Sequence, residues 1–398
     1  MKTYLTIILV IIFLIVSFSV LAGSFEEEIL KKLFIFQKSQ LRYLFSKSFL
    51  QQVSFEEIVS VIDQYSTKLG DIKSIEKNED GYLLIFEKGS VPARIEINEA
   101  NMISSLWFGN YSLVNDSLSD IVEKFRNLSG DVSISVIKNN SEKIITYNDQ
   151  QKMAVGSAFK LHILKVLYQE IANTEKNWHD IIELNEKNRS LPFGIIQNWP
   201  EGTPVTLKTL SILMISQNDN TASDHLFDYL GHKKLEAEFS EENIPFLKTR
   251  ELFILKFSDK KEIREQYLNS SVEEKRKILK EISSEKLKNV EIGDKPVSID
   301  KLEWFLSTEE LARIIFELKD AEEIKINSGL VQKKNYYLAG YKNGLEPGVL
   351  NFTYILQKTP ESEIYTISVT VNNKNRNINK EKVVQLVSQL IDSVVKNQ

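Results

Sequence analysis

The sequence predicts an α+β protein in which a small α+β domain precedes a larger domain with an antiparallel five-stranded sheet and a layer of helices. Alternating apolar residues mark short strands in two separate regions of the chain. In the second region the strands occur near both ends, and apolar residues at helical spacing fill the stretch between them. A length of 398 residues also makes two domains the natural expectation.

The composition is that of an ordinary globular protein, with 42% apolar and 26% charged residues. A net charge of −5 without a long basic run argues against a nucleic-acid partner, because phosphates require a positive surface. The absence of cysteine excludes disulfides, thiolate nucleophiles and cysteine-ligated metals. The histidines have no ligand-like spacing, so we expect neither a metal nor a cofactor.

Residues 1–22 have the features of a signal peptide or a membrane anchor. Lys2 is followed by an almost unbroken apolar run, and Val20-Leu21-Ala22 offers small residues to a signal peptidase. Cleavage after Ala22 is favoured, and the alternative is that residues 3–22 are retained, because they are nearly as long as a spanning helix. Either reading predicts a secreted, periplasmic or cell-envelope protein, which we expect to be a monomer.

Residues 24–112 form the predicted small domain. Apolar spacing indicates a helix over residues 25–46 and a second over 55–66, which follows a Ser54 cap. Alternation then predicts strands at 72–76, 82–86 and 93–97. No catalytic constellation is apparent in this region.

Residues 118–398 form the predicted larger domain. A short helix to residue 128 leads into its first strands, and the remaining strands follow near the end of the chain. The strands are expected at 132–137, 143–147, 336–341, 349–356 and 364–371, before a final helix over 380–395. Residues 255–290 are dense in Lys and Glu, which indicates an exposed insertion.

Ser157-Ala158-Phe159-Lys160 is the first candidate for chemistry. A serine hydroxyl becomes a good nucleophile only when a base takes its proton. Ser157 and Lys160 share one face of a helical turn, so the amine can reach the hydroxyl. The alternative is an ordinary helix start with Ser157 as its N-cap.

Two further strings follow this Ser-x-x-Lys motif. Asn218-Asp219-Asn220 separates two helical stretches and offers amides to a substrate carbonyl, although it also fits a plain helix N-cap. Lys342-Asn343-Gly344 follows the strand expected to end at residue 341, where a cation and a glycine would suit a substrate carboxylate. A simple turn is the alternative for this last string.

In this order the three strings resemble the motif set of class A β-lactamases and penicillin-binding proteins. Flanking sequence adds to the resemblance, including residues 192–197, 201–207, 245–252 and 345–350. The chain is most similar to the two-domain serine hydrolases associated with clavulanic-acid gene clusters. That resemblance implies a cystatin-like or steroid-isomerase-like first domain and a β-lactamase-like second domain.

The resemblance also implies roles for individual residues. Ser157 would be the acylated nucleophile and Lys160 its base. Asn220 would hold the amide side chain of the substrate, while Lys342 and Gly344 would lie at its carboxylate and backbone. The backbone N–H groups of Ser157 and Leu345 would form the oxyanion hole, where each such donor is typically worth about 3 kcal/mol.

The middle and last motifs depart from the family. Asn218 stands where the family has a serine that relays a proton to the leaving nitrogen, and Ser216 is a conceivable substitute that belongs to the preceding helix. In the last motif, Asn343 and Leu345 replace small hydroxylated residues that commonly help to hold the carboxylate.

The deacylation loop is the third departure. The Glu-Pro-Glu-Leu-Asn loop of class A β-lactamases is absent, and the corresponding stretch is residues 248–253. This places Thr249 near the position of the deacylating glutamate. Glu251 is the nearby carboxylate and is therefore the catalytic candidate, with a structural role as the alternative.

The leading hypothesis is an exported serine hydrolase that acts on a small molecule: a β-lactam, a peptide or an ester. A non-catalytic or slowly deacylating binding or sensor protein is the first alternative, because all three departures affect turnover. A D,D-peptidase is the second, since one fold hosts several chemistries.

Overall fold

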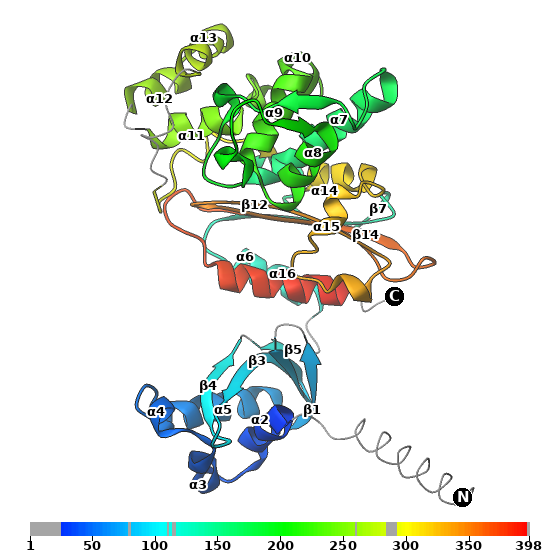
Figure 1. Ribbon diagram of the computed structural model, residues 1–398. Coiled ribbons are helices and arrows are strands. Elements are labelled where there is room, and N and C mark those ends of the chain that lie inside the picture. The colour runs from blue at the N-terminus through cyan, green and yellow to red at the C-terminus, as the bar shows by residue number, and fades with distance from the viewer. Residues whose placement is uncertain are drawn as a thin grey trace, which may run out of the picture. The chain divides into compact units, whose positions relative to one another are not determined.

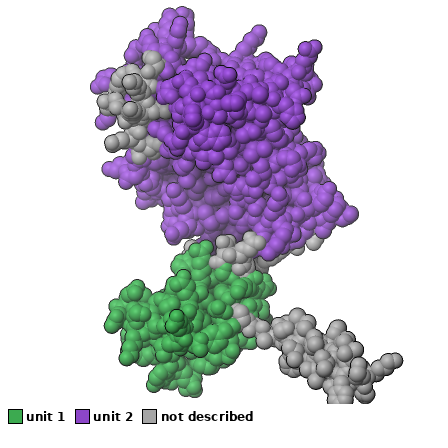
Figure 2. Space-filling model, in the orientation of Figure 1, with its two compact units in different colours: residues 1–117 green, residues 118–398 purple. Residues whose placement is uncertain are grey.

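In the computed structural model the described residues are 25–78, 81–109, 111–113, 117–258, 261–283 and 293–395. They fall into two compact units, residues 1–117 and 118–398, which Figure 2 colours separately. The signal peptide or anchor expected at residues 1–22 lies outside the described residues. Within the described ranges, no helix combines the length and apolar character that crossing a membrane requires.

The first unit packs short helices against an antiparallel sheet with the strand order β1-β2-β3-β4, in which β5 also pairs with β3. Its helices are α2 (Phe25–Ile35), α3 (Lys38–Leu41), α4 (Lys47–Leu50) and α5 (Phe55–Leu69). Its strands are β1 (Ile72–Asn78), β2 (Gly81–Phe86), β3 (Gly89–Ile97), β4 (Ile103–Phe108) and β5 (Ser112–Leu113). Buried side chains of α2, α5 and the strands form its own core.

The single helix expected over residues 25–46 is wrong. Helix α2 ends at Ile35, and Gln37 adopts an extended conformation with ψ of 146° before α3 begins. This break allows Leu41 and Phe45 to reach the core that α2 also covers, where each is only 3% exposed. The predicted Ser54 cap is confirmed, because its hydroxyl accepts the N–H of Glu57 in a reciprocal capping box.

The second unit is built on a five-stranded antiparallel sheet with the order β12-β13-β14-β6-β7. Its strands are β6 (Asp131–Lys138), β7 (Glu142–Tyr147), β12 (Leu338–Glu346), β13 (Val349–Gln357) and β14 (Ile364–Asn372). The pairing of β14 with β6 closes the sheet between the two ends of this unit, as the positions of the strands predict. Strand β12 does not end at Tyr341, because residues 342–346 remain paired with β13 down to Glu346 and Val349.

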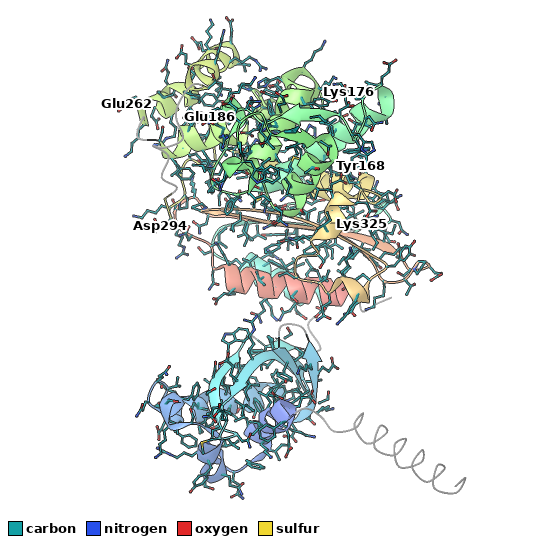
Figure 3. All side chains as sticks on the ribbon, in the orientation of Figure 1. Tyr168, Lys176, Glu186, Glu262, Asp294 and Lys325 are labelled. Atoms are coloured by element: carbon teal, nitrogen blue, oxygen red, sulfur yellow. The ribbon has the colours of Figure 1, made fainter. Side chains whose placement is uncertain are left out.

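Helices cover both faces of this sheet (Figure 1). Helices α6 (Leu118–Arg126) and α16 (Lys380–Val395) pack on one face, where their apolar side chains share a core with the strands. The layer on the other face contains α7 (Lys160–Asn173), α8 (Leu207–Ser216), α9 (Asn220–Leu230), α10 (His232–Glu236), α11 (Thr249–Phe257), α14 (Thr308–Glu317) and α15 (Glu323–Ile326). Side chains of this layer fill the space down to the sheet (Figure 3).

Two small strand pairs brace the helical layer. β8 (Met153–Ala154) pairs with β11 (Phe305–Leu306), and β9 (Ile181–Glu183) pairs with β10 (Pro204–Thr206). Strand β8 ends two residues before Gly156 in the chain, and its pairing with β11 anchors it. It therefore fixes the backbone that leads into the Ser-x-x-Lys motif.

The expectation of an exposed insertion over residues 255–290 is wrong for the inner faces of its described helices. Helix α12 (Lys261–Leu268) and helix α13 (Val272–Ile282) are amphipathic and contribute to the main core. Tyr267, Ile278 and Ile282 are each less than 5% exposed. The abundant Lys and Glu residues occupy the outer faces, which is why composition alone suggested an exposed insertion.

Candidate active site

The nucleophile candidate lies on a single 3-10 turn, Gly156–Phe159, between β8 and α7. Ser157 is partly exposed, whereas both of its neighbours in this turn are buried. The backbone before it is held by a hydrogen bond from Val155 N–H to the Trp304 carbonyl at 3.1 Å. Gly156 has a φ of +50°, a conformation that glycine adopts with little strain. The turn thus holds Ser157, a partly exposed residue, on a fixed backbone.

Lys160 opens helix α7 one turn after Ser157, and its side chain is fully buried. Its Nζ donates to the Asn218 carbonyl at 2.8 Å and to Asn220 Oδ1 at 2.7 Å. Burial lowers the pKa of Lys160 to about 7, although the carboxylates of Asp219 and Asp224 oppose the shift. Near neutral pH a large fraction of this lysine is therefore a free amine that can accept a proton.

Asn218 links Lys160 to the strand β12. It has a φ of +57°, a left-handed conformation that asparagine tolerates better than most residues. While its carbonyl accepts from Lys160, its Oδ1 accepts from Lys342 Nζ and its Nδ2 donates to Asn343 Oδ1 at 3.1 Å. One residue therefore connects both candidate lysines.

Lys342 is 1% exposed, and its Nζ also donates to the Asn343 carbonyl at 2.9 Å. Burial lowers the pKa of Lys342 well below its usual value, and the charge of Lys160 lowers it further. The bonding partners given for these two lysines are neutral amides and carbonyls. A substrate carboxylate placed here would restore the protonated form of Lys342.

The backbone of Gly344 and Leu345 packs directly against the nucleophile turn. A Cβ added at Gly344 would lie 1.8 Å from the Val155 carbonyl oxygen, so only glycine fits this position. A Cβ at Gly156 would likewise lie 3.1 Å from the Leu345 nitrogen. The structure thus brings the amide of Leu345 beside the turn that carries Ser157, as an oxyanion hole made from both residues requires.

Asn220 and Asp219 hold the loop that forms the opposite wall. Asn220 Nδ2 donates to the Leu191 carbonyl at 2.9 Å, and its N–H donates to the Phe193 carbonyl at 2.9 Å. The Asp219 carboxylate accepts the N–H groups of residues 195 and 196. Phe193 is consequently presented at the surface, where it is 47% exposed.

Glu251 is not joined to this network by any contact that the structure gives. Its carboxylate accepts the N–H of Lys248 at 2.9 Å, in the first turn of its own helix α11. Burial raises the pKa of Glu251 to about 7. These contacts match the structural alternative for Glu251.

Thr249 instead connects to the site through a buried polar cluster that sequence reasoning did not identify. Its hydroxyl contacts Asp224 Oδ1 at 2.7 Å, Ser190 Oγ at 2.8 Å and the Asn220 carbonyl at 3.2 Å. Asp224 also accepts the N–H groups of Thr249 and Arg250, and burial raises its pKa to about 6. Asp224 lies four residues after Asn220 on α9, a spacing that could have drawn attention to it.

Ser216, the conceivable substitute for the missing motif serine, bonds to its own helix. Its hydroxyl donates to the Ile212 carbonyl at 2.7 Å, and the residue is 8% exposed. It therefore offers no proton to the group around Lys160 in this arrangement. Among the described residues, no cluster of three or more His, Cys, Asp or Glu side chains could hold a metal ion.

An apolar hollow of about 300 Å³ adjoins the oxyanion backbone. Its walls include Phe193 from the loop, Phe253 from α11 and Leu345 from β12. Asp294, labelled in Figure 3, is one of the polar residues among those that line it. The hollow can receive an apolar group attached to a carbonyl that sits between Ser157 and Leu345.

A model of the beta-lactamase enzyme family matches residues 114–395. No curated protein matches the chain. A β-lactamase of Sphaerobacter thermophilus is 15% identical, over 71% of this chain and 96% of that chain, with a TM-score of 0.49. A β-lactamase of Francisella tularensis is 15% identical over 70% and 98%, with a TM-score of 0.48. A PBP-A variant, solved as an acyl-enzyme complex with penicillin G, is 13% identical over 71% and 96%, with a TM-score of 0.47.

Proposed function

This chain belongs to the beta-lactamase enzyme family, and we propose that it is an exported serine hydrolase acylated at Ser157 with Lys160 as the base. The observation that carries the proposal is the environment of Lys160. A fully buried amine with a pKa of about 7, one turn after a partly exposed serine, is a base poised for neutral pH. Among the residues that the structure describes, no other group with a pKa shifted to about 7 lies within one helical turn of Ser157 in the chain.

The proposed acylation begins when the Lys160 amine takes the proton of the Ser157 hydroxyl. The Ser157 oxygen then attacks the substrate carbonyl, and the backbone N–H groups of Ser157 and Leu345 stabilise the developing oxyanion. A substrate carboxylate would pair with Lys342, and the amide of Asn220 would hold the acyl side chain. When the tetrahedral intermediate collapses, the Lys160 ammonium returns its proton to the leaving group.

Asn218 makes this proton return depend on Lys160 alone. An amide cannot relay a proton as the family serine does, and its three bonds to Lys160, Lys342 and Asn343 keep it in a fixed bridging position. Amide leaving groups need protonation more than activated ester leaving groups do. The leaving group of a β-lactam is also an amide nitrogen, but relief of ring strain favours its departure. We therefore expect β-lactams and activated esters to react faster than ordinary peptides, which disfavours the D,D-peptidase alternative.

Slow deacylation is the second functional candidate, and the contacts of Glu251 favour it. Its carboxylate accepts an N–H of its own helix, and Thr249 has no carboxylate to offer at the corresponding position. Without a deacylating base the acyl-enzyme would persist, as in a binding or sensor protein. Glu251 remains a candidate base only if acyl-enzyme decay depends on it.

The apolar hollow supports a substrate with an apolar acyl group, such as a small amide or ester, and we propose that the enzyme acts on it as a monomer. Residues 1–22 would direct export to the cell envelope or the medium, either cleaved after Ala22 or retained as an anchor. The first domain, residues 24–112, would have the steroid-isomerase-like shape found in the hydrolases of clavulanic-acid clusters. It would contribute a ligand pocket or a partner surface.

A labelling experiment tests the proposed nucleophile and base together. A fluorescent penicillin is incubated with the wild type and with Ser157→Ala, Lys160→Met and Ser216→Ala, and the label is then mapped by peptide mass spectrometry. We expect the label on the peptide containing Ser157, none on Ser157→Ala, much slower labelling of Lys160→Met and unchanged labelling of Ser216→Ala. Labelling of Ser157→Ala at the wild-type rate would refute the proposal.

A further inference from the structure

A buried charged cluster joins helix α11 to both sides of the proposed oxyanion hole. Lys256 Nζ lies 2.5 Å from Glu303 Oε1 and also contacts Glu346 Oε1. The side chains of Lys256 and Glu303 are 0% exposed and that of Glu346 is 7% exposed. Because buried charges are expensive unless paired, such a cluster is weak evidence for stability and calls for another explanation.

Glu346 lies next to the first proposed oxyanion donor, the backbone N–H of Leu345. Glu346 directly follows Leu345 in β12 and is paired with Val349 across the hairpin. Holding the Glu346 side chain on α11 therefore fixes the end of β12, where the Leu345 amide lies beside Gly156.

Glu303 is connected through Trp304 to the turn that carries the second proposed donor, the backbone N–H of Ser157. Glu303 directly precedes Trp304, whose carbonyl accepts the Val155 N–H at 3.1 Å. The Trp304 ring stacks on Phe159, with the ring centroids 3.8 Å apart. Trp304 therefore contacts both ends of the turn that carries Ser157.

We propose that Lys256 is a positioning residue that sets the separation between the backbone N–H groups of Ser157 and Leu345. It does so by holding Glu303 and Glu346 to a single ammonium group. The inference rests on the proposed function, because it assumes an oxyanion that these two N–H groups stabilise. Lys256 touches neither the substrate nor the reacting atoms.

The electrostatics of the cluster agree with this role. Burial raises the pKa of Glu346 well above its usual value, and the nearby Glu303 raises it further while Lys256 lowers it. One ammonium group and two carboxylates would give the cluster a net negative charge, and a proton on Glu346 makes it neutral. Removing Lys256 would leave a buried carboxylate without its cation.

The test compares Lys256→Met with a matched control in the full chain. Lys208→Met also strips a buried glutamate of its cation, because Lys208 Nζ lies 2.6 Å from Glu323 Oε1 and Glu323 is 0% exposed. Lys208 lies in the first turn of helix α8, about 12 Å along the helix from Ser216, its last residue before the Asn218 motif. The acylation rate constant and the dissociation constant of the noncovalent complex are measured separately with penicillin G, and urea unfolding is followed for every variant.

We expect Lys256→Met to lower the acylation rate constant by about 10- to 100-fold, because a displaced oxyanion donor acts on the transition state. The dissociation constant should change less than about threefold, since the ground-state complex does not need the oxyanion hole. Lys208→Met should lose stability without this change in rate. An equal loss of rate in both variants, or a loss confined to binding, would overturn the proposal.

Glu346→Leu removes the contact between the end of β12 and Lys256. It serves as the second variant if Lys256→Met does not fold. Its acylation rate constant should fall by about threefold to tenfold, and an unchanged rate would overturn the inference. The wild type distinguishes the two proposals. If it takes no adduct at Ser157, the proposed function fails and this inference with it; if it reacts and the variants react equally fast, only this inference fails.

Discussion

Replacing Asn220 by aspartate should change the pKa of Lys160, the proposed base, while the side chain keeps almost the same size and shape. In the native site Asn220 Oδ1 accepts from Lys160 Nζ at 2.7 Å. Asn220→Asp places a carboxylate at that distance from the amine. An opposite charge this close favours the protonated lysine, so the pKa of Lys160 should rise.

The size of the effect follows from the pKa of Lys160, which is about 7 in the native site. Roughly one-tenth of the lysine is then neutral at pH 6 and roughly nine-tenths at pH 8, so acylation should increase with pH across this window. A neighbouring carboxylate raises a lysine pKa by about 1 to 3 units. The midpoint in Asn220→Asp should therefore lie between about pH 8 and 10, and acylation at pH 7 should fall by about five- to 500-fold.

The assay is the acylation rate constant measured by rapid-quench intact-protein mass spectrometry from about pH 5.5 to about pH 11, one unit beyond the highest expected midpoint. Asn220→Leu is the matched control, because it also loses the hydrogen bond to the Leu191 carbonyl but adds no charge. Its rate should fall without an alkaline shift of the midpoint. The midpoint, rather than the rate at one pH, therefore reports on Lys160.

Two results would refute this reasoning. A wild-type rate that is flat between pH 5.5 and 8.5 would show that no group with a pKa near 7 is deprotonated for acylation. An Asn220→Asp midpoint that coincides with that of the wild type would show that the titrating group is not Lys160.

Three further predictions concern the oxyanion backbone, the apolar hollow and Glu251. Gly344→Ala should lower the acylation rate by about 100-fold, because its Cβ would meet the Val155 carbonyl at 1.8 Å. Gly293→Ala is the control, because nothing lies within 4 Å of its added Cβ, and it should leave the acylation rate unchanged. A wild-type acylation rate in Gly344→Ala would contradict the close packing of Gly344 against Val155. Phe193→Ala should lower kcat/KM for esters with apolar acyl groups by about threefold to tenfold while sparing acetyl esters, and an equal loss for both would argue against the hollow as an acyl site. The pKa of Glu251 is raised from 4.5 to about 7, so its contribution to stability is complete below pH 4.5 and is lost as the pH rises through 7. Glu251→Gln should therefore have a higher urea midpoint than the wild type at pH 8 but not near pH 4, and its acyl-enzyme should decay at the wild-type rate. A lower urea midpoint at pH 8, or slower decay of the acyl-enzyme, would contradict the structural role.

Local sequence patterns predicted most of the sheet and many of the helix positions. Strands β6, β7, β13 and β14 lie within about one residue of their expected ends. Each has apolar residues on a buried face, and this signal does not depend on distant parts of the chain. Ser157 and Lys160 lie in consecutive helical segments, the turn Gly156–Phe159 and the start of α7, because a spacing of three residues is a local feature.

What failed were features that depend on distant contacts. The string Lys342-Asn343-Gly344 resembles a turn in isolation, yet it is strand because β13 pairs with it and because Val155 packs against Gly344. The break in the first helix follows from the core that Leu41 joins rather than from its own sequence. The contacts of Asp224 with residues 249 and 250 span about 25 positions, so no local pattern predicts them.

The burial of Lys160 was equally hidden from the sequence. Full burial lowers its pKa, and the carboxylates of Asp219 and Asp224, which lie at the start of a different helix, oppose the shift. A Ser-x-x-Lys string states only that the two side chains share a face. Tertiary packing decides whether the lysine is a base or a surface cation.

Intact-protein mass spectrometry shows directly whether Ser157 forms a covalent acyl-enzyme. The wild type and Ser157→Ala are incubated with penicillin G and a small panel of other β-lactams, and the protein mass is followed over time. We expect an added mass equal to the intact drug in the wild type alone, with slow decay because the Glu251 carboxylate accepts an N–H at the start of its own helix. The absence of any adduct, with no loss of drug from solution, would contradict this expectation.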